Sequence, residues 1–100
     1  MFELVETTVF SRWMEGLRDI RARARITTRL ARIGFGNFGD ARPVGEGISE
    51  LRIDYGPGYR VYFTRRGERV VLLLCGGDKS SQARDVARAK AMAKELNDDR

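Results

Sequence analysis

The chain has 100 residues and a net charge of +5, with 19 Lys and Arg against 14 Asp and Glu. Its length allows one domain, residues 1–100, with one modest core, and its single cysteine excludes an intrachain disulfide. No apolar run approaches the roughly 20 residues of a membrane helix, so we expect a cytoplasmic protein without a membrane segment.

Arginine supplies 16 of the 19 basic residues. Its planar guanidinium group makes forked contacts with phosphate and carboxylate groups, so a small basic domain of this kind favours nucleic acid or an acidic protein as its partner. Arginine-rich usage can equally reflect genome composition, and charge alone leaves both interpretations open.

The first third of the chain predicts a short strand and then two helices. Residues 2–6 alternate apolar and polar side chains, as a strand with one buried face does. Thr7 and Thr8 offer hydroxyl groups that can cap the next helix. That helix carries an apolar stripe formed by Phe10, Trp13, Met14 and Leu17. We expect the two helices to form a hairpin on one face of a sheet.

The second helix, expected from about Ile20 to Ile33, has an apolar side and an adjacent basic side. The apolar side consists of Ala22, Ile26, Leu30 and Ile33. The basic side consists of Arg21, Arg25, Arg29 and Arg32. This basic side is either a solvated charged face or a stripe that follows phosphates or a negative partner surface.

Glycine and phenylalanine residues between 34 and 40 predict a loop. The segment lacks the Lys-Ser/Thr ending and the preceding strand of a phosphate-binding glycine loop, so we reject that interpretation. We expect Phe35 and Phe38 to tuck under the helices, and residues 42–46 to continue the connection.

Three runs, Ile48–Ile53, Tyr59–Thr64 and Arg69–Leu74, are rich in β-branched, aromatic or leucine side chains and are separated by turn residues. They predict an antiparallel meander. The last run does not alternate, which favours a central strand buried on both faces. Residues 80–82 then lead into a final helix, capped by a serine and expected to end near Leu96. Its apolar stripe consists of Val86, Ala89, Ala93 and Leu96.

Cations on the first two strands of the meander indicate that one face of the sheet carries functional residues. A core does not accept Arg52 or Arg60 unpaired. Because side chains alternate along a strand, Val61 and Phe63 should pack on the helices. We therefore expect Arg60 to be an exposed cation on the opposite face.

Three segments, GISELR from Gly47, GYRVYF from Gly58 and LCGGDKSSQ from Leu74, resemble one family of proteins. It is the RelE/ParE superfamily of toxins from type II toxin–antitoxin modules, and within it the HigB-like branch, often called addiction module killer proteins. The resemblance extends over essentially the whole chain. It implies an α+β, RelE-like fold, with an N-terminal strand and a helical hairpin packed on a mostly antiparallel sheet and a C-terminal helix.

The resemblance also implies an activity and its partners. Such toxins are metal-independent, ribosome-dependent mRNA endonucleases that inhibit translation and need no cofactor. A cognate helix-turn-helix antitoxin neutralises them, and operator DNA is contacted only through that antitoxin. Two alternatives remain open: a ParE-like toxin that poisons DNA gyrase without cutting RNA, and an inactive module that only binds its antitoxin.

The functional positions of the family correspond here to Arg52, Arg60 and Lys79, with Glu50 on the same strand face as Arg52. Together the three cations favour RNA cleavage. Arg60 would stabilise the charge that develops on phosphorus, Arg52 would hold a flanking phosphate, and Lys79 would stabilise charge or donate a proton. The candidates for contact with RNA or the ribosome are Arg21, Arg25, Arg29, Arg32 and Arg84.

Some relatives use His or Tyr near the active site, whereas this chain has no histidine, the usual side chain for proton transfer near neutral pH. Glu50 and Asp85 are candidates for the general base. The structural alternatives are a cross-strand salt bridge for Glu50 and a first-turn helix charge for Asp85. Without histidine, and with one cysteine, we expect no zinc site.

Overall fold

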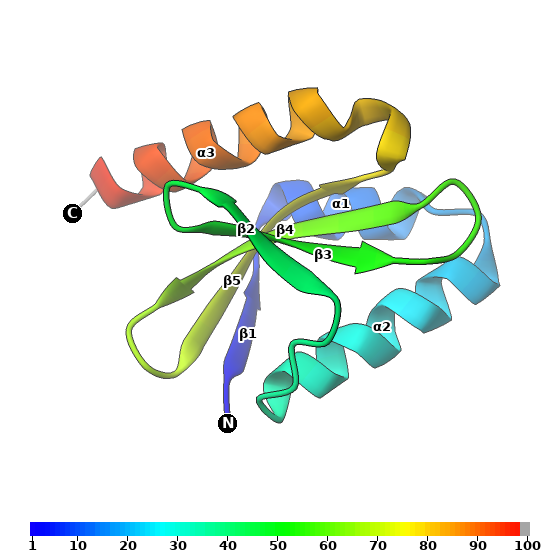
Figure 1. Ribbon diagram of the computed structural model, residues 1–100, viewed down its shortest axis with the longest axis horizontal. Helices are drawn as coiled ribbons and strands as arrows, with labels where there is room; N and C mark the ends of the chain where they lie inside the picture. The colour runs from blue at the N-terminus through cyan, green and yellow to red at the C-terminus, as the bar shows by residue number, and fades with distance from the viewer. Residues whose placement is uncertain (99–100) are drawn as a thin grey trace.

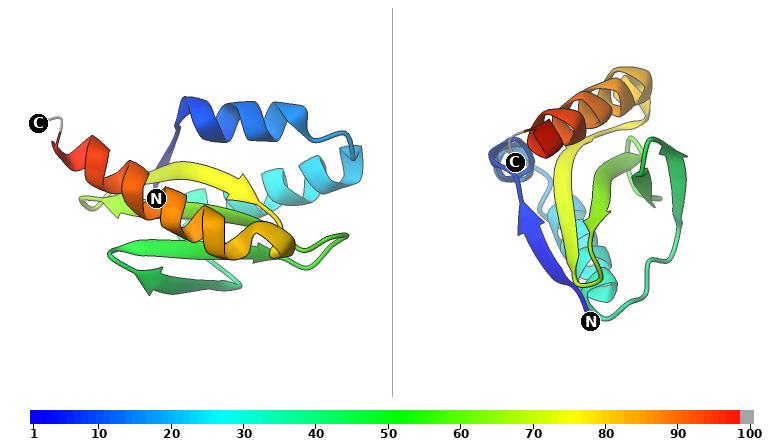
Figure 2. Two further views of the ribbon diagram at one scale, coloured as in Figure 1. Left: turned by 90° about the horizontal axis from the view of Figure 1, so that it is seen from above. Right: turned by 90° about the vertical axis from the view of Figure 1, so that its left-hand side faces the viewer.

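A five-stranded sheet forms the centre of the computed structural model, which describes residues 1–98 (Figure 1). The elements are β1 (Glu3–Glu6), α1 (Thr8–Gly16), α2 (Ile20–Gly34), β2 (Ala41–Gly45), β3 (Ile48–Ile53), β4 (Tyr59–Arg66), β5 (Val70–Gly77), a short 3-10 turn (Lys79–Ser81) and α3 (Gln82–Asp98). The strand order is β1-β5-β4-β3-β2, with β1 and β2 at opposite edges (Figure 2). Only the β1–β5 pair is parallel, so the expected mostly antiparallel α+β fold is confirmed.

Helices cover both faces of the sheet and create two apolar cores. In Figure 1, α3 lies above the sheet and α2 below it. The core under α1 and α2 is formed by Phe10, Ile26, Ile33, Leu51, Ile53, Val61, Phe63, Val71 and Leu73. The core under α3 is formed by Ile48, Tyr62, Leu74, Cys75, Ala89 and Ala93. As predicted, β5 supplies buried side chains to both cores, and Val61 and Phe63 face the helical pair.

Side-chain caps start both N-terminal helices where the sequence predicts. The Thr7 hydroxyl accepts a hydrogen bond from the Phe10 amide at 3.1 Å and donates one to the Leu74 carbonyl at 2.6 Å. The Asp19 carboxylate accepts from the amides of Arg21 and Ala22, which satisfies donors that the first turn of a helix leaves unpaired. These caps hold α1 against β5 and fix the start of α2.

Four local expectations differ from the structure. Residues 41–45 form the edge strand β2 rather than a loop. Pro43 and a register shift beside it conceal the strand, yet an edge strand tolerates proline because one side of its backbone needs no partner. Phe35 is 76% exposed, whereas Phe38 packs against Phe2 and Phe63 as expected.

The other two differences lie at the end of the sheet. Strand β5 continues three residues beyond Leu74, to Gly77. The cap that follows is Asp78, which pairs with Ser81 in a capping box and starts the 3-10 turn before α3. No helix within residues 1–98 is long and apolar enough to cross a membrane.

The two glycines that end β5 let helices approach the sheet from both sides. A Cβ atom at Gly76 would overlap the ring of Trp13 on α1, and one at Gly77 would overlap the carboxylate of Asp85 on α3. Each glycine therefore makes room for a side chain from another element, which is a physical reason for two consecutive glycines at this position.

Replacing Gly76 by Ala should destabilise the protein by about 2 kcal/mol, because the added methyl group displaces the Trp13 ring from a packed site. Urea denaturation measures the loss. Gly16→Ala is the matched control, since no atom beyond its chain neighbours and its own helix backbone lies within 4 Å of the added methyl group, and it should leave stability unchanged or slightly higher. Equal stability of the wild type and Gly76→Ala would show that Trp13 is not held against this strand.

Candidate active site

A buried carboxylate on β3 organises the face of the sheet next to α3. Glu50 is fully buried and accepts three hydrogen bonds: from Arg60 Nη1 at 2.7 Å, the Tyr62 hydroxyl at 3.0 Å and Gln82 Nε2 at 2.9 Å. The Arg42 guanidinium adds a longer contact, with Nε 3.7 Å from Oε1. One side chain therefore joins β3, β4 and the start of α3.

These partners keep Glu50 charged. Burial by itself would raise its pKa, but hydrogen bonds from Gln82 and Tyr62 and the positive charge of Arg60 outweigh burial and lower the pKa below its ordinary value. Its carboxylate is fully buried and already accepts three hydrogen bonds, an environment that suits an ion pair better than proton transfer. The alternative interpretation, a cross-strand salt bridge, is confirmed.

The expectation that Arg60 is an exposed cation is wrong. Its exposed fraction is 6%, because α3 covers this part of the sheet and Glu50 supplies the compensating charge. A buried guanidinium is tolerated when it is paired and hydrogen-bonded. Deleting Arg60 would therefore destabilise the fold as well as the site.

Despite this burial, Arg60 reaches a pocket of about 320 Å³ that also contains the other predicted cations. Arg52 lies directly opposite Arg60 in the β3–β4 ladder, and Lys79 comes from the turn after β5. The pocket is lined by Asp40, Arg52, Ile53, Asp54, Gly58, Arg60 and Lys79. The structure thus brings together Arg52, Arg60 and Lys79, with Glu50 behind Arg60.

Two exposed carboxylates in this pocket, Asp40 and Asp54, were not among the predicted site residues. Asp54 has a signal in the sequence, because it comes two residues after Arg52 and so continues the same side of the chain. Asp40 has none, because it ends a glycine-rich loop whose path the sequence leaves undefined.

The other predicted base, Asp85, lies outside the pocket. It is buried in the first turn of α3 and accepts a hydrogen bond from the Ser81 hydroxyl. The predicted first-turn location is confirmed, and a carboxylate there complements the helix dipole. The Arg84 side chain is 82% exposed, with Nε 3.8 Å from Asp85 Oδ1, and it too lies apart from the pocket-lining residues.

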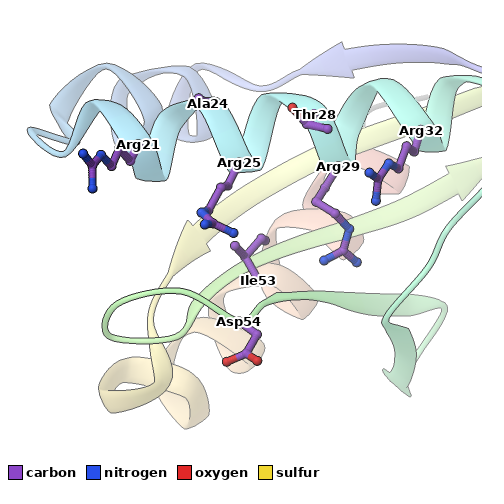
Figure 3. Close-up of a pocket in the computed structure, with 8 residues that line it drawn as sticks. All are labelled: Arg21, Ala24, Arg25, Thr28, Arg29, Arg32, Ile53 and Asp54. Carbon is purple, nitrogen blue, oxygen red and sulfur yellow. The ribbon is translucent and has the colours of Figure 1, made fainter.

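The basic side of α2 lines a second hollow, which we call the arginine groove (Figure 3). Its volume is about 530 Å³, and its lining consists of Arg21, Ala24, Arg25, Thr28, Arg29, Arg32, Ile53 and Asp54. Figure 3 shows the arginines on one side of α2, with Arg25 and Arg29 directed toward the end of β3. The stripe is therefore the wall of a groove and is also largely solvated, since Arg21, Arg25 and Arg32 are exposed.

Two of these arginines also hold the fold together. Arg29 Nη1 donates to the Arg52 carbonyl at 2.7 Å, which ties α2 to β3. The Arg25 guanidinium lies 4.7 Å from the centre of the Tyr55 ring, and the Tyr55 hydroxyl donates to Asp19 at 2.9 Å. Arg21 and Arg32 are exposed. Among residues 1–98, no three His, Cys, Asp or Glu side chains are grouped so that they could hold a metal ion.

Comparison with known proteins shows which family the chain belongs to. The family described as "Phage derived protein Gp49-like" matches residues 12–97. The chain belongs to this Gp49-like family. The family is of the toxin–antitoxin type and is related to addiction module killer proteins. The matched Gp49-like region contains the whole pocket and the arginine groove.

A protein of Haemophilus influenzae, described only as uncharacterized, is similar to this Gp49-like chain along nearly its full length. The two are 49% identical over 94 residues, which cover 94% of this chain and 95% of the relative.

Replacing Glu50 by Gln should destabilise this Gp49-like protein by about 3–5 kcal/mol at neutral pH, because it leaves Arg60 buried without a compensating charge. Urea denaturation measures the loss. Glu50→Gln/Arg60→Met, which removes both charges, should recover part of it. Glu68→Gln, at an exposed turn position, is the control and should change little.

The pH dependence of stability gives a second readout of the same variant. The fold lowers the pKa of Glu50. The stability that ionised Glu50 contributes is therefore fully present above the ordinary pKa of glutamate, and it is lost as the pH falls through the lowered pKa. Glu50→Gln should lack this part of the acid-induced loss. A variant with the wild-type stability and the wild-type pH profile would contradict the buried ion pair.

Proposed function

We propose that this Gp49-like protein is the toxin of a type II toxin–antitoxin module, of the HigB-like branch of the RelE/ParE superfamily. Its activity is ribosome-dependent cleavage of mRNA, which inhibits translation. The observation that supports this proposal is the meeting of Arg52, Arg60 and Lys79 in one pocket, at positions that correspond to the functional positions of those toxins.

The proposed reaction is an attack within the RNA strand. The 2′-hydroxyl oxygen forms a bond to the adjacent phosphorus, and the bond from phosphorus to the 5′-oxygen breaks. The products are a 2′,3′-cyclic phosphate and a 5′-hydroxyl. The transition state carries extra negative charge on the phosphate oxygens, and cations already in place stabilise it without reorganisation.

Each residue in the pocket has a role in this proposal. Arg60, held in place by Glu50, contacts the reacting phosphate with its forked donors, and Arg52 holds a flanking phosphate. Lys79 is exposed and gives its proton to the leaving 5′-oxygen, while the Asp54 carboxylate takes the proton of the 2′-hydroxyl. Asp54 replaces Glu50 and Asp85 in this role because its carboxylate lines the pocket and is exposed.

The proposed partners follow from this activity. The substrate is mRNA on the ribosome in the cytoplasm, and a helix-turn-helix antitoxin neutralises the toxin and alone contacts operator DNA. Expression without the antitoxin should arrest bacterial growth, and primer extension on a translated reporter should show cuts in phase with codons. Intact mRNA with accumulating broken DNA would indicate gyrase poisoning, and growth without damage to either would indicate a module that only binds its antitoxin.

Variants of the pocket test the assignment of residues. Lys79→Ala and Arg52→Gln should each lower the cleavage rate by about a hundredfold, the usual effect of removing one preorganised charge donor. Both should leave stability nearly unchanged, since Lys79 is exposed and Arg52 is half-buried. Lys94→Ala, at an exposed position of α3 outside the pocket, is the control. Folded Lys79→Ala protein that cleaves at the wild-type rate would place the site elsewhere.

A further inference from the structure

No ion pair among the described residues involves an arginine of the groove, and the nearby carboxylates of Asp19 and Asp54 leave a net excess of positive charge. Among the described residues, the carboxylates in ion pairs are Glu46, Glu50 and Asp85, and none of them pairs with an arginine of the groove. Asp54 lines the groove and forms no ion pair among the described residues either. Four guanidinium groups on one wall therefore leave a strong positive field for an anionic ligand.

The spacing of this charge suits a linear ligand with repeated negative groups. Arg21, Arg25 and Arg29 are four residues apart, which separates them by about 6 Å along the helix axis. Neighbouring phosphates of an extended single strand are separated by a similar distance. Arg32 continues the row at the far end of α2.

One of the arginines also presents a flat surface. The Arg25 guanidinium lies over one face of the Tyr55 ring, and Tyr55 is anchored by its hydrogen bond to Asp19, the cap of α2. The ring thus holds the guanidinium group in place. Exposed planes of this kind stack with unpaired bases of single-stranded RNA.

The groove and the pocket adjoin one another. Ile53 and Asp54 line both, and Arg29 of the groove donates to the backbone carbonyl of Arg52 of the pocket. A strand bound in the pocket therefore leaves it directly beside α2. An acidic protein segment would match the charge, but it would use neither the flat surface of Arg25 nor the adjoining cationic pocket.

We infer that the arginine groove binds the single-stranded RNA that flanks the cleaved phosphate, with Arg21 and Arg32 on phosphates about 16 Å apart along the helix axis and a base stacked on Arg25 between them. This inference rests on the proposed function. The protein would then contact about half a dozen nucleotides of the substrate, through the groove as well as the pocket.

Direct binding tests the inference separately from cleavage. The probe is a labelled RNA strand of about a dozen nucleotides with 2′-O-methyl groups, which lack the attacking hydroxyl and so cannot be cut. Fluorescence anisotropy measures its affinity over a salt series. Arg21→Gln/Arg32→Gln should weaken binding by about tenfold and make the salt slope shallower by about 1.4, the value for two lost phosphate contacts.

Two further variants supply the controls. Arg23→Gln/Arg69→Gln removes the same charge from exposed positions outside the groove and should change affinity by less than about twofold. Arg25→Lys keeps the charge but loses the plane, so affinity should fall by about tenfold with the salt slope unchanged. All variants are checked by circular dichroism for a wild-type fold.

The outcomes separate this inference from the proposed function. Equal losses of RNA affinity in the two double variants would overturn the inference, as would a wild type that does not bind the strand at low salt. Selective binding of an acidic protein segment in place of RNA would also overturn it and would assign the groove to a protein partner. The cleavage phenotype of the pocket variants is measured independently. Wild-type binding that depends on Arg21 and Arg32 without any cleavage of mRNA would contradict the proposed function but support the groove as an RNA site.

Discussion

The buried ion pair between Glu50 and Arg60 is the interaction on which the rest of the site depends. Both side chains are removed from water, which costs free energy that only close pairing and complete hydrogen bonding offset. Tyr62 and Gln82 supply the remaining donors to Glu50. The pair therefore requires β3, β4 and α3 to be correctly packed, and the same packing fixes the orientation of Arg60 at the rim of the pocket. Stability and the geometry of the site are coupled through one carboxylate.

The pocket and the arginine groove meet at the end of β3, and they differ in how they are built. The pocket takes its cations from separate parts of the chain, which β-strand pairing and the turn after β5 bring together. The groove takes its cations from one helix, and its arginines align through helical periodicity alone. The hydrogen bond from Arg29 to the Arg52 carbonyl joins the two. A ligand that bridges both would therefore contact two elements, α2 and β3, that are hydrogen-bonded to each other.

Much of this arrangement is predictable from the sequence, for identifiable reasons. Helical stripes and strand alternation place Ile26, Val61 and Phe63 correctly because each pattern has one periodicity and one buried side. Strand β2 escapes prediction because Pro43 and Gly45 disfavour a strand, and pairing with β3 decides the conformation of the segment. The burial of Arg60 is not predictable because it depends on the partner that Glu50 provides and on the cover that α3 provides, both of which are tertiary. Asp40 joins the pocket only through the path of a glycine-rich loop.

The chemistry of the RNA ends tests the central claim most directly. The reaction assigned to Arg52, Arg60 and Lys79 uses the 2′-hydroxyl of the substrate as the nucleophile, so it fixes the groups left on both fragments. Purified protein added to ribosomes that translate a defined mRNA should generate fragments ending in a 2′,3′-cyclic phosphate and beginning with a 5′-hydroxyl, identified by mass spectrometry. Fragments with 3′-hydroxyl and 5′-phosphate ends, or an uncut message, would contradict the account.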